Sequence, residues 1–348
     1  MTSPDWKAEY EKVRPRYVEY ANSLRGLVET IIRKKVDVVQ VDRRAKTVES
    51  FAEKIGRKAG KYADPLKEMT DLVGIRVIAY YVEDVDQIVE LLRAQFDVLE
   101  EHSANKQDAL APDQFGYASN HLVIRLGESR RGLPEWELYS DVAVEIQVRT
   151  TLQHAWASVD HKLSYKRIEE VPASLKRQLF RLSALFEMAD EQFSAIRNST
   201  RQLSHEYTDN VKRGDLEIRI DADSIDAYIR NSPRVALIVH AAAASGVEVS
   251  MDSSESSRSN LILLAGHLGA VTIEEFDRLL PDEVATVRKA LIVMKEVAQI
   301  DDPWFTTVYL FLTDICLVLH PVTREFFDST FTGWDTLVEE KARMGSQG

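Results

Sequence analysis

The sequence predicts an α+β fold, with a mixed β-sheet domain flanked by helices and then an all-helical C-terminal domain. Between about residues 70 and 150, segments with a hydrophobic period of two lie among segments with a helical period. After about residue 170 almost every segment has the helical period. A chain of 348 residues also exceeds the size at which a single core usually stops growing. We therefore expect two domains, 1–200 and 201–348.

The first domain is expected to contain both kinds of element in mixed order. Charged amphipathic segments predict helices over 5–35 and 46–61. Alternating patterns predict three strands, and helical patterns predict two further helices that follow the first and the last of them. The strands are 70–81, 120–126 and 141–150, and the helices are 84–96 and 151–166.

The second domain begins after an apolar heptad repeat, which predicts either an interdomain helix or a dimer seam. Residues 215–220 are expected to form a short strand or an extended linker, and the serine-rich stretch 253–258 a loop. Thr272 and Glu275 form a capping box, and Asp302–Pro303 resembles a helix start. The heptad residues are Leu175, Leu179, Leu182, Phe186, Ala189, Phe193 and Ile196.

Composition restricts the compartment and the general class of protein. The single cysteine, Cys316, excludes an intramolecular disulfide and a multi-cysteine zinc site, and it fits a reducing cytoplasm. Residues 1–16 have no apolar core of a signal peptide, and no apolar stretch is long enough to span a membrane. We therefore expect a cytoplasmic protein with no membrane partner.

The charge distribution points to a local anionic ligand. The net charge of −12 argues against a general nucleic-acid coat. Residues 1–166 carry 25 basic and 27 acidic side chains, so most of the negative charge lies in the second half. Residues 42–62, in contrast, carry seven basic and three acidic side chains. A basic segment in an acidic protein is typical of a site for phosphates or carboxylates.

Within this segment, four side chains are spaced to share one face of the helix expected over 46–61. They are Lys46, Ser50, Lys54 and Arg57, with Arg44 just before them. Such a face suits several phosphates at once. The alternative is a solvated surface on which Glu49 and Glu53 form salt bridges with these basic side chains. The stretch 56–62 resembles a P-loop, but it is one residue too short and lacks the required hydroxyl.

Two strands carry polar groups that could form a metal site. In 144–149, Val144, Ile146 and Val148 share one face, and Glu145, Gln147 and Arg149 share the other. Asp71 precedes the strand that carries Gly74 and Arg76. Two carboxylates on adjacent strands beside arginines could hold Mg²⁺ against a triphosphate, whereas the simpler interpretation is a surface ion pair.

A loop and a helix add aromatic and histidine side chains. Tyr117 could stack on a purine base, although a tyrosine at a strand entry more often packs in a core. His121 follows on the strand 120–126. His154 and His161 are seven residues apart on one helical face and do not have the spacing of a zinc pair.

Together and in this order, these motifs resemble the RelA/SpoT synthetase domain, the nucleotide pyrophosphokinases that make (p)ppGpp. The matching stretches are 44–58, 71–85, 115–121, 144–150 and 154–166. The similarity is greatest to small alarmone synthetases, whose fold is nucleotidyltransferase-like. The chain has no His–Asp dipeptide of the hydrolase domain found in long members, and only some 40 residues precede the synthetase motifs. We therefore expect no hydrolysis of the alarmone.

The resemblance implies a role for each matching residue. Arg44 and Arg76 would sandwich the adenine of ATP, and Asp71 and Glu145 would hold Mg²⁺. Glu145 would also take the proton from the acceptor 3′-hydroxyl. The other roles fall into three groups. The ATP phosphates would be bound by Lys46, Ser50, Lys54 and Arg57; the acceptor by Tyr117, His121 and His154; and the polar face would be completed by Gln147 and Arg149.

The acceptor side departs from the family pattern. Ala118 replaces a basic residue, Asn120 replaces an apolar one, and His154 stands where Asn or Asp is more usual. The expected function is a GTP diphosphokinase that uses ATP and GDP or GTP. Two alternatives stay open: a toxic small synthetase that modifies the tRNA 3′ end or an adenosine nucleotide, and a non-catalytic nucleotide-binding regulator. The C-terminal domain could mediate homo-oligomerisation or bind a partner.

Overall fold

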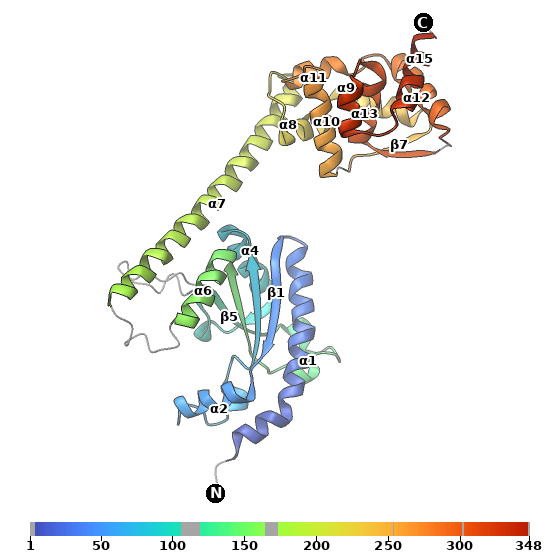
Figure 1. Ribbon diagram of the computed structural model, residues 1–348. Coiled ribbons are helices and arrows are strands. Elements are labelled where there is room, and N and C mark those ends of the chain that lie inside the picture. Colours follow the sequence, from blue (N-terminus) through green and yellow to red (C-terminus); the bar gives the residue numbers. More distant parts are fainter. Residues whose placement is uncertain (1–3, 106–118, 164–172, 253, 301–302, 347–348) are drawn as a thin grey trace. The chain divides into compact units, whose positions relative to one another are not determined.

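The computed structural model describes residues 4–105, 119–163, 173–252, 254–300 and 303–346. The chain divides into two compact units, Met1–Arg197 and Asn198–Gly348, each with its own hydrophobic core. Figure 1 shows both units, and each is described by itself. In the described part of the chain, no helix is long and apolar enough to cross a bilayer.

The first unit is built on a mixed sheet, as predicted. Its strands are β1 (Val38–Ala45), β2 (Val73–Ala79), β3 (Phe96–Val98), β5 (Asn120–Leu126) and β6 (Val144–Thr150), in the order β1-β2-β6-β5-β3, and the short β4 (Ala104–Asn105) also pairs with β5. Strands β2 and β6 are parallel, and the other pairs are antiparallel. The sequence predicted β2, β5 and β6.

One face of this sheet is apolar and covered by helices. Alternate residues of β2 and β6 are buried in a core shared with α1 (Trp6–Arg33) and α4 (Val82–Gln95). Figure 1 shows α1 running beside β1. The opposite face carries the polar side chains of β6, so the predicted assignment of apolar and polar faces is confirmed. Smaller elements complete the unit: α3 (Pro65–Glu68), α5 (Glu128–Arg131) and the 3₁₀ turns η1 (Glu100–His102) and η2 (Glu137–Tyr139).

Strand β1 was not predicted because a bulge breaks its alternation. The register shifts between Val38 and Gln40, so the buried residues Val38 and Val41 are three positions apart. A two-residue period is therefore absent from the sequence. This strand carries Arg44, which we had expected just before a helix.

The helix predicted over 46–61 is shorter than expected. Helix α2 spans Val48–Arg57, and the Thr47 hydroxyl accepts a hydrogen bond from the Ser50 amide at its start. This N-cap places Lys46 outside the helix, in the connection from β1. Lys58 leaves the helical conformation, and Gly60 has a positive φ of 80°.

Two helices follow β6. Helix α6 is Thr151–Leu163 and α7 is Ala173–Arg213. Helix α7 contacts the first unit through polar side chains and one aromatic pair. Thr150 donates to Asp190 at 2.5 Å, Ser194 donates to Glu83 at 2.8 Å and Arg197 pairs with Asp84. Of the predicted heptad face, Phe186 takes part, with its ring centroid 6.2 Å from that of Trp156, whereas Leu175, Leu182, Phe193 and Ile196 are exposed.

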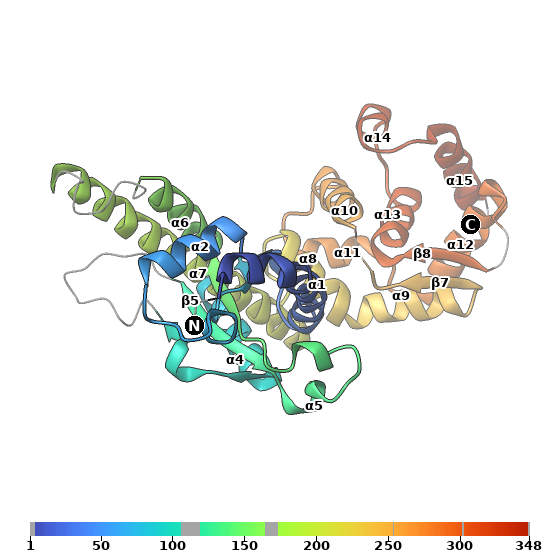
Figure 2. The ribbon, with the colours of Figure 1, turned by 90° about the horizontal axis from the view of Figure 1, so that it is seen from below.

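The second unit is helical, as predicted, and also contains a small sheet that was not predicted. Its helices are α8 (Ala222–Asn231), α9 (Pro233–Ala243), α10 (Glu255–His267), α11 (Ile273–Leu279), α12 (Val284–Ala298), α13 (Val308–Leu319), α14 (Arg324–Thr330) and α15 (Trp334–Ser346). Strands β7 (Val247–Ser250) and β8 (Trp304–Thr307) pair in parallel, as Figure 2 shows.

Some of the local features predicted for this unit are present, and others differ. The capping box of Thr272 and Glu275 is present at the start of α11. The serine-rich stretch is not only a loop, since Ser254 caps α10 and the helix begins at Glu255. Asp302 lies outside the described residues, and the chain after Pro303 forms β8 before α13 begins at Val308. Residues 215–220 form an extended segment with one bridge, Arg219 to Thr272.

Candidate functional site

Polar side chains from adjacent strands meet on the open face of the sheet. The register places Arg44, Gly74 and Glu145 in one row across β1, β2 and β6. The next row crosses β1, β2, β6 and β5 and consists of Asp42, Arg76, Gln147 and His121. Residues paired in this way point to the same face of a sheet, so residues separated by a hundred positions in the sequence become neighbours.

A pocket of about 310 Å³ lies over these rows. Its walls include the predicted residues Arg44, Arg76, Glu145 and Gln147, and also Asp42 and Arg43, which the sequence did not indicate. Gly74 forms part of its floor. A Cβ atom at position 74 would lie 3.1 Å from Arg44 Nε and 3.2 Å from Arg44 Cγ, so the missing side chain lets the arginine lie against β2.

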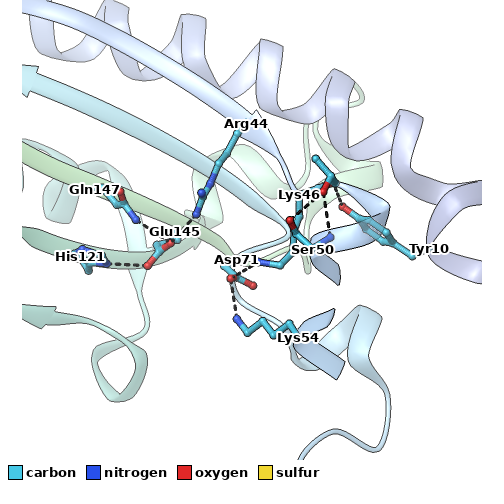
Figure 3. Close-up of polar contacts among 10 residues, drawn as sticks. Tyr10, Arg44, Lys46, Ser50, Lys54, Asp71, His121, Glu145 and Gln147 are labelled. Atoms are coloured by element: carbon cyan, nitrogen blue, oxygen red, sulfur yellow. Dashed lines mark hydrogen bonds and ion pairs between the residues drawn. The ribbon is translucent and has the colours of Figure 1, made fainter. Parts of the chain in front are cut away.

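Glu145 is fixed by three neighbours, which Figure 3 shows around its carboxylate. His121 Nδ1 lies 2.8 Å from Oε1, Gln147 Nε2 donates to Oε2 at 3.3 Å, and Arg44 Nη2 lies 3.7 Å from Oε2. Burial favours the neutral acid, but the hydrogen bond and charge of His121 and the charge of Arg44 hold the pKa of Glu145 below its usual range. The carboxylate is therefore ionised at neutral pH.

His121 connects Glu145 to a hydroxyl. Its Nε2 atom lies 2.9 Å from Ser119 Oγ, while Nδ1 contacts the Glu145 carboxylate. The ring therefore uses both nitrogens, which fixes its orientation. The sequence had placed His121 on a strand near the site but had not indicated the contact with Ser119.

Asp71 binds two lysines with one oxygen. Lys46 Nζ and Lys54 Nζ each donate to Asp71 Oδ2 at 2.7 Å (Figure 3). Burial favours the neutral acid, but these two hydrogen bonds and charges hold the pKa of Asp71 below its usual range. Asp71 Oδ1 is buried and has no hydrogen-bond partner. This cluster therefore holds two cations and one unused carboxylate oxygen in a largely buried position.

Side chains of helix α1 bind the backbone carbonyl of Lys46. Tyr10 Oη and Arg14 Nε donate to the Lys46 carbonyl at 2.8 and 3.0 Å, and the Lys46 amide donates to Leu72 O at 2.9 Å. Tyr10 also stacks on Phe51 with ring centroids 4.2 Å apart. The roles of Tyr10 and Arg14 were not predicted, because nothing in a charged helix indicates which carbonyl its side chains will reach.

The predicted single face of Lys46, Ser50, Lys54 and Arg57 is wrong as a helical stripe. Lys46 precedes α2, and only Lys46 and Lys54 meet at Asp71. Ser50 bonds to Thr47 instead, and both Ser50 and Arg57 are exposed. The two lysines meet because both bind Asp71, Lys46 from the connection between β1 and α2 and Lys54 from α2.

Three more predicted residues lie at the far end of the polar face. Arg149 is buried and donates to Gln147 Oε1, and burial together with the charge of Arg76 lowers the pKa of Arg149 to about 10. Arg76 Nε is buried without a partner. Burial and the charges of Arg76 and Arg149 lower the pKa of His154, so its ring is neutral at pH 7. Tyr117 lies outside the described residues.

Comparison with known proteins gives the family. Residues 43–170 match the family model described as a region found in RelA / SpoT proteins. The GTP pyrophosphokinase YjbM of Bacillus subtilis (strain 168) is 30% identical over 170 residues, which are 49% of this chain and 76% of that relative. The chain belongs to the RelA/SpoT family. A second relative from the same organism, GTP pyrophosphokinase YwaC, is 30% identical over 159 residues, 44% of this chain and 71% of its own length.

Two solved structures are also similar to this chain. The crystal structure of the small alarmone synthetase 1 from Bacillus subtilis has 28% sequence identity and a TM-score of 0.46, and it covers 56% of this chain and 98% of its own. The same synthetase bound to its product pppGpp has 27% identity and a TM-score of 0.47, covering 55% and 98%. The membership of the chain in the RelA/SpoT family, predicted from its motifs, is confirmed by the family match and by the relative that is 30% identical.

Asp71 is the residue best suited to a metal ion. Its unpartnered Oδ1 atom is a hard oxygen ligand of the kind that Mg²⁺ prefers. Glu145 lies close enough that its pKa responds to the charge of Asp71, although both of its oxygens already have partners. Among the described residues, no group of three or more His, Cys, Asp or Glu side chains is arranged to hold a metal. A metal here would therefore depend on ligands from bound phosphates.

Proposed function

We propose that this RelA/SpoT chain transfers the β,γ-pyrophosphate of ATP to the 3′-hydroxyl of GDP or GTP, releasing AMP. The observation that carries the proposal is an ionised carboxylate, Glu145, fixed on the pocket wall between Arg44 and His121. The similarity to two GTP pyrophosphokinases supports the same class of reaction.

The ATP side follows from the placement of the cations. Arg44 and Arg76 both line the pocket, and two guanidinium planes there can stack on a purine ring. Lys46 and Lys54, held together by Asp71, place two ammonium groups where a polyphosphate would find opposite charge. Ser50 and Arg57, exposed on α2, would reach the same phosphates from solvent. The proposed site thus combines two arginines that can stack on a purine ring with two lysines that can bind phosphates.

The chemical step requires a base at the acceptor oxygen. Glu145 takes the proton of the 3′-hydroxyl, and the oxygen attacks the β-phosphorus of ATP. The bond between the β-phosphorus and the oxygen that bridges it to the α-phosphorus breaks, and AMP leaves with that oxygen. The chain positions the reactants in line and offsets the negative charge, as in other phosphoryl-type transfers. His121 orients Glu145 and stabilises its ionised form.

Mg²⁺ fits the Asp71 end of the site. Asp71 Oδ1 and Glu145 would hold it together with phosphate oxygens of ATP. When bound, it would supply charge neutralisation for the triphosphate. Lys46 and Lys54 provide a further two positive charges at Asp71.

On the acceptor side, His121 and His154 are the described candidates. Neutral His154 offers a ring donor and acceptor for a base edge, and its Nδ1 is buried without a partner. Arg149 donates a hydrogen bond to Gln147, and this contact fixes both side chains on the polar face of β6. Tyr117, proposed to stack on the acceptor base, lies outside the described residues.

The acceptor is identified by a competition experiment with labelled ATP. Purified protein is incubated with ATP labelled at the γ-phosphate and with GDP, GTP, AMP and tRNA, singly and together. We expect label in a GDP or GTP product and no transfer to tRNA or AMP. Label found only in tRNA or in an adenosine product would replace the proposed acceptor while keeping the donor chemistry. Absence of transfer to any acceptor would favour a nucleotide-binding regulator.

The Gly74→Ala variant tests the role of Arg44. The new methyl group would displace the Arg44 side chain from β2, since its nearest atoms would be 3.1 and 3.2 Å away. Losing one stacked guanidinium costs about 1–2 kcal/mol, so the KM for ATP should rise roughly tenfold with a smaller change in kcat. Steady-state kinetics measure both constants. Gly26→Ala is the matched control, because nothing lies within 4 Å of the added atom. An unchanged KM for ATP in Gly74→Ala would contradict the stacking role.

A further inference from the structure

The second unit contains a cavity that the proposed synthetase chemistry does not use. It has a volume of about 460 Å³ and lies among α12, β8, α13, α14 and α15. Figure 2 shows these elements within the second unit. The wall combines apolar and aromatic side chains, Trp304, Phe327, Phe331 and Leu337 among them, with three threonines and two carboxylates. A cavity of this size and lining is typical of sites for small organic molecules.

Two carboxylates face this cavity. Glu340 from α15 is only 9% exposed, and both it and Asp314 from α13 line the cavity. Within the described part of the chain, no hydrogen bond or ion pair is found for either carboxylate, and both open into the cavity. Such groups normally have a partner, because an unpaired charge is expensive to bury.

The basic side chains near the cavity are paired with other groups. Lys341, next to Glu340, donates to the carbonyl of His320, and Arg343 pairs with Glu339 and Glu296. On α14, Arg324 pairs with Asp328. Among the described lining residues, Asp314 and Glu340 are the charged ones, and no lysine, arginine or histidine joins them. Burial raises the pKa of each carboxyl group to about 7, with the charge of Glu340 adding to the effect on Asp314.

We propose that this cavity binds an organic cation, a protonated amine or guanidinium on an apolar stem. The cation would supply the positive charge that pairs with Asp314 and Glu340. Its apolar stem would pack against the aromatic side chains of the wall. Cations also bind favourably over aromatic faces, which Trp304, Phe327 and Phe331 offer. A hard metal ion fits less well, because it needs six or more oxygen ligands and would leave the aromatic side chains of the wall without a role.

Calorimetry on the full-length protein tests this with benzylamine and its neutral counterpart benzyl alcohol. We expect benzylamine to bind at least tenfold more tightly than benzyl alcohol at pH 8. Binding should weaken about tenfold at pH 6, because fewer carboxylates with a pKa of about 7 are ionised there. Equal affinity for the two compounds, or no binding of benzylamine, would overturn the proposal.

Variants locate the binding. Glu340→Gln and Asp314→Asn should each weaken benzylamine binding at least tenfold, whereas Glu339→Gln, an exposed neighbour, should leave it unchanged. Glu340→Gln should also raise the melting temperature of the unliganded protein at pH 8, with a smaller gain at pH 5, because it removes a charge that is present only at the higher pH. Benzylamine affinity that survives both substitutions in folded protein would place the amine elsewhere and refute the assignment.

A last comparison separates the two sources of such a cation. Pentylamine represents a free amine, and Nα-acetyl-lysine N-methylamide represents a lysine side chain as a protein presents it. Both carry the proposed chemistry, so binding of either supports the site. Tighter binding of the lysine derivative points to a side chain of a partner protein, and tighter binding of pentylamine to a free amine. Failure of both would overturn the proposal without affecting the synthetase assignment, because the cavity lies wholly in the second unit.

Discussion

The Glu145→Gln variant should transfer pyrophosphate about 10²–10⁴-fold more slowly than the wild-type protein, with little change in ATP binding. Glutamine preserves the size of the side chain and can still accept a hydrogen bond, but it cannot take a proton from the acceptor hydroxyl. In the structure, Glu145 is ionised and oriented by His121 and Gln147. Rapid-quench kinetics with labelled ATP measure the transfer step, and equilibrium binding of a non-hydrolysable ATP analogue measures the affinity.

Two controls separate the base from a general effect of charge. Glu128→Gln removes an exposed carboxylate on α5 and should leave the rate unchanged. His121→Ala removes the hydrogen bond that keeps the pKa of Glu145 low, so the acid limb of the pH–rate profile should move to higher pH. In the wild type, the low pKa keeps the base ionised, so the rate should not fall on the acid side between pH 8 and pH 6. A Glu145→Gln protein with wild-type rate would eliminate Glu145 as the base.

The Asp71→Asn variant should lower kcat/KM by about 10²–10³-fold, which is the range seen when one charge-stabilising group is lost from an active site. The substitution removes the charge that holds Lys46 and Lys54 within 2.7 Å of one oxygen. Two largely buried ammonium groups would then repel each other and move apart. Asparagine also keeps only one of the two oxygens and loses the negative charge beside the proposed Mg²⁺ position, so more Mg²⁺ should be needed for half-maximal activity.

Asp141→Asn serves as the matched control for Asp71→Asn. Asp141 is exposed and lies just before β6, so its substitution should change neither kcat/KM nor the Mg²⁺ requirement. Measuring activity against Mg²⁺ concentration for both variants distinguishes metal binding from lysine positioning. If Asp71→Asn loses activity with an unchanged Mg²⁺ requirement, Asp71 positions the lysines and does not hold the metal.

How much of the fold could be predicted depended on whether each pattern stayed regular. Strands β2, β5 and β6 have clear patterns of hydrophobic residues and were predicted close to their observed bounds. The bulge in β1 and the brevity of β3, β4, β7 and β8 hid those strands. The heptad pattern of α7 identified only part of the packing face, because this helix contacts the first unit through Asp190 and Ser194 as well as through Phe186.

In the candidate site, the arrangement of residues close together in the sequence could be predicted, but contacts between residues far apart in the sequence could not. Strand alternation predicted that Glu145, Gln147 and Arg149 share a face, and the structure places them there. The sequence could not show that Lys46 and Lys54 meet on one Asp71 oxygen, or that Tyr10 holds the Lys46 carbonyl. Those contacts depend on where α1 and α2 pack, which no local pattern encodes.

The most direct test of the proposed reaction is a ³¹P NMR measurement on purified protein with ATP, Mg²⁺ and GDP. Transfer of pyrophosphate predicts AMP and a guanosine product with a new diphosphate spin pair, formed in equal amounts and nearly absent with Glu145→Gln. Formation of ADP with a single transferred phosphate, or of AMP with free pyrophosphate and no new guanosine nucleotide, would contradict the account.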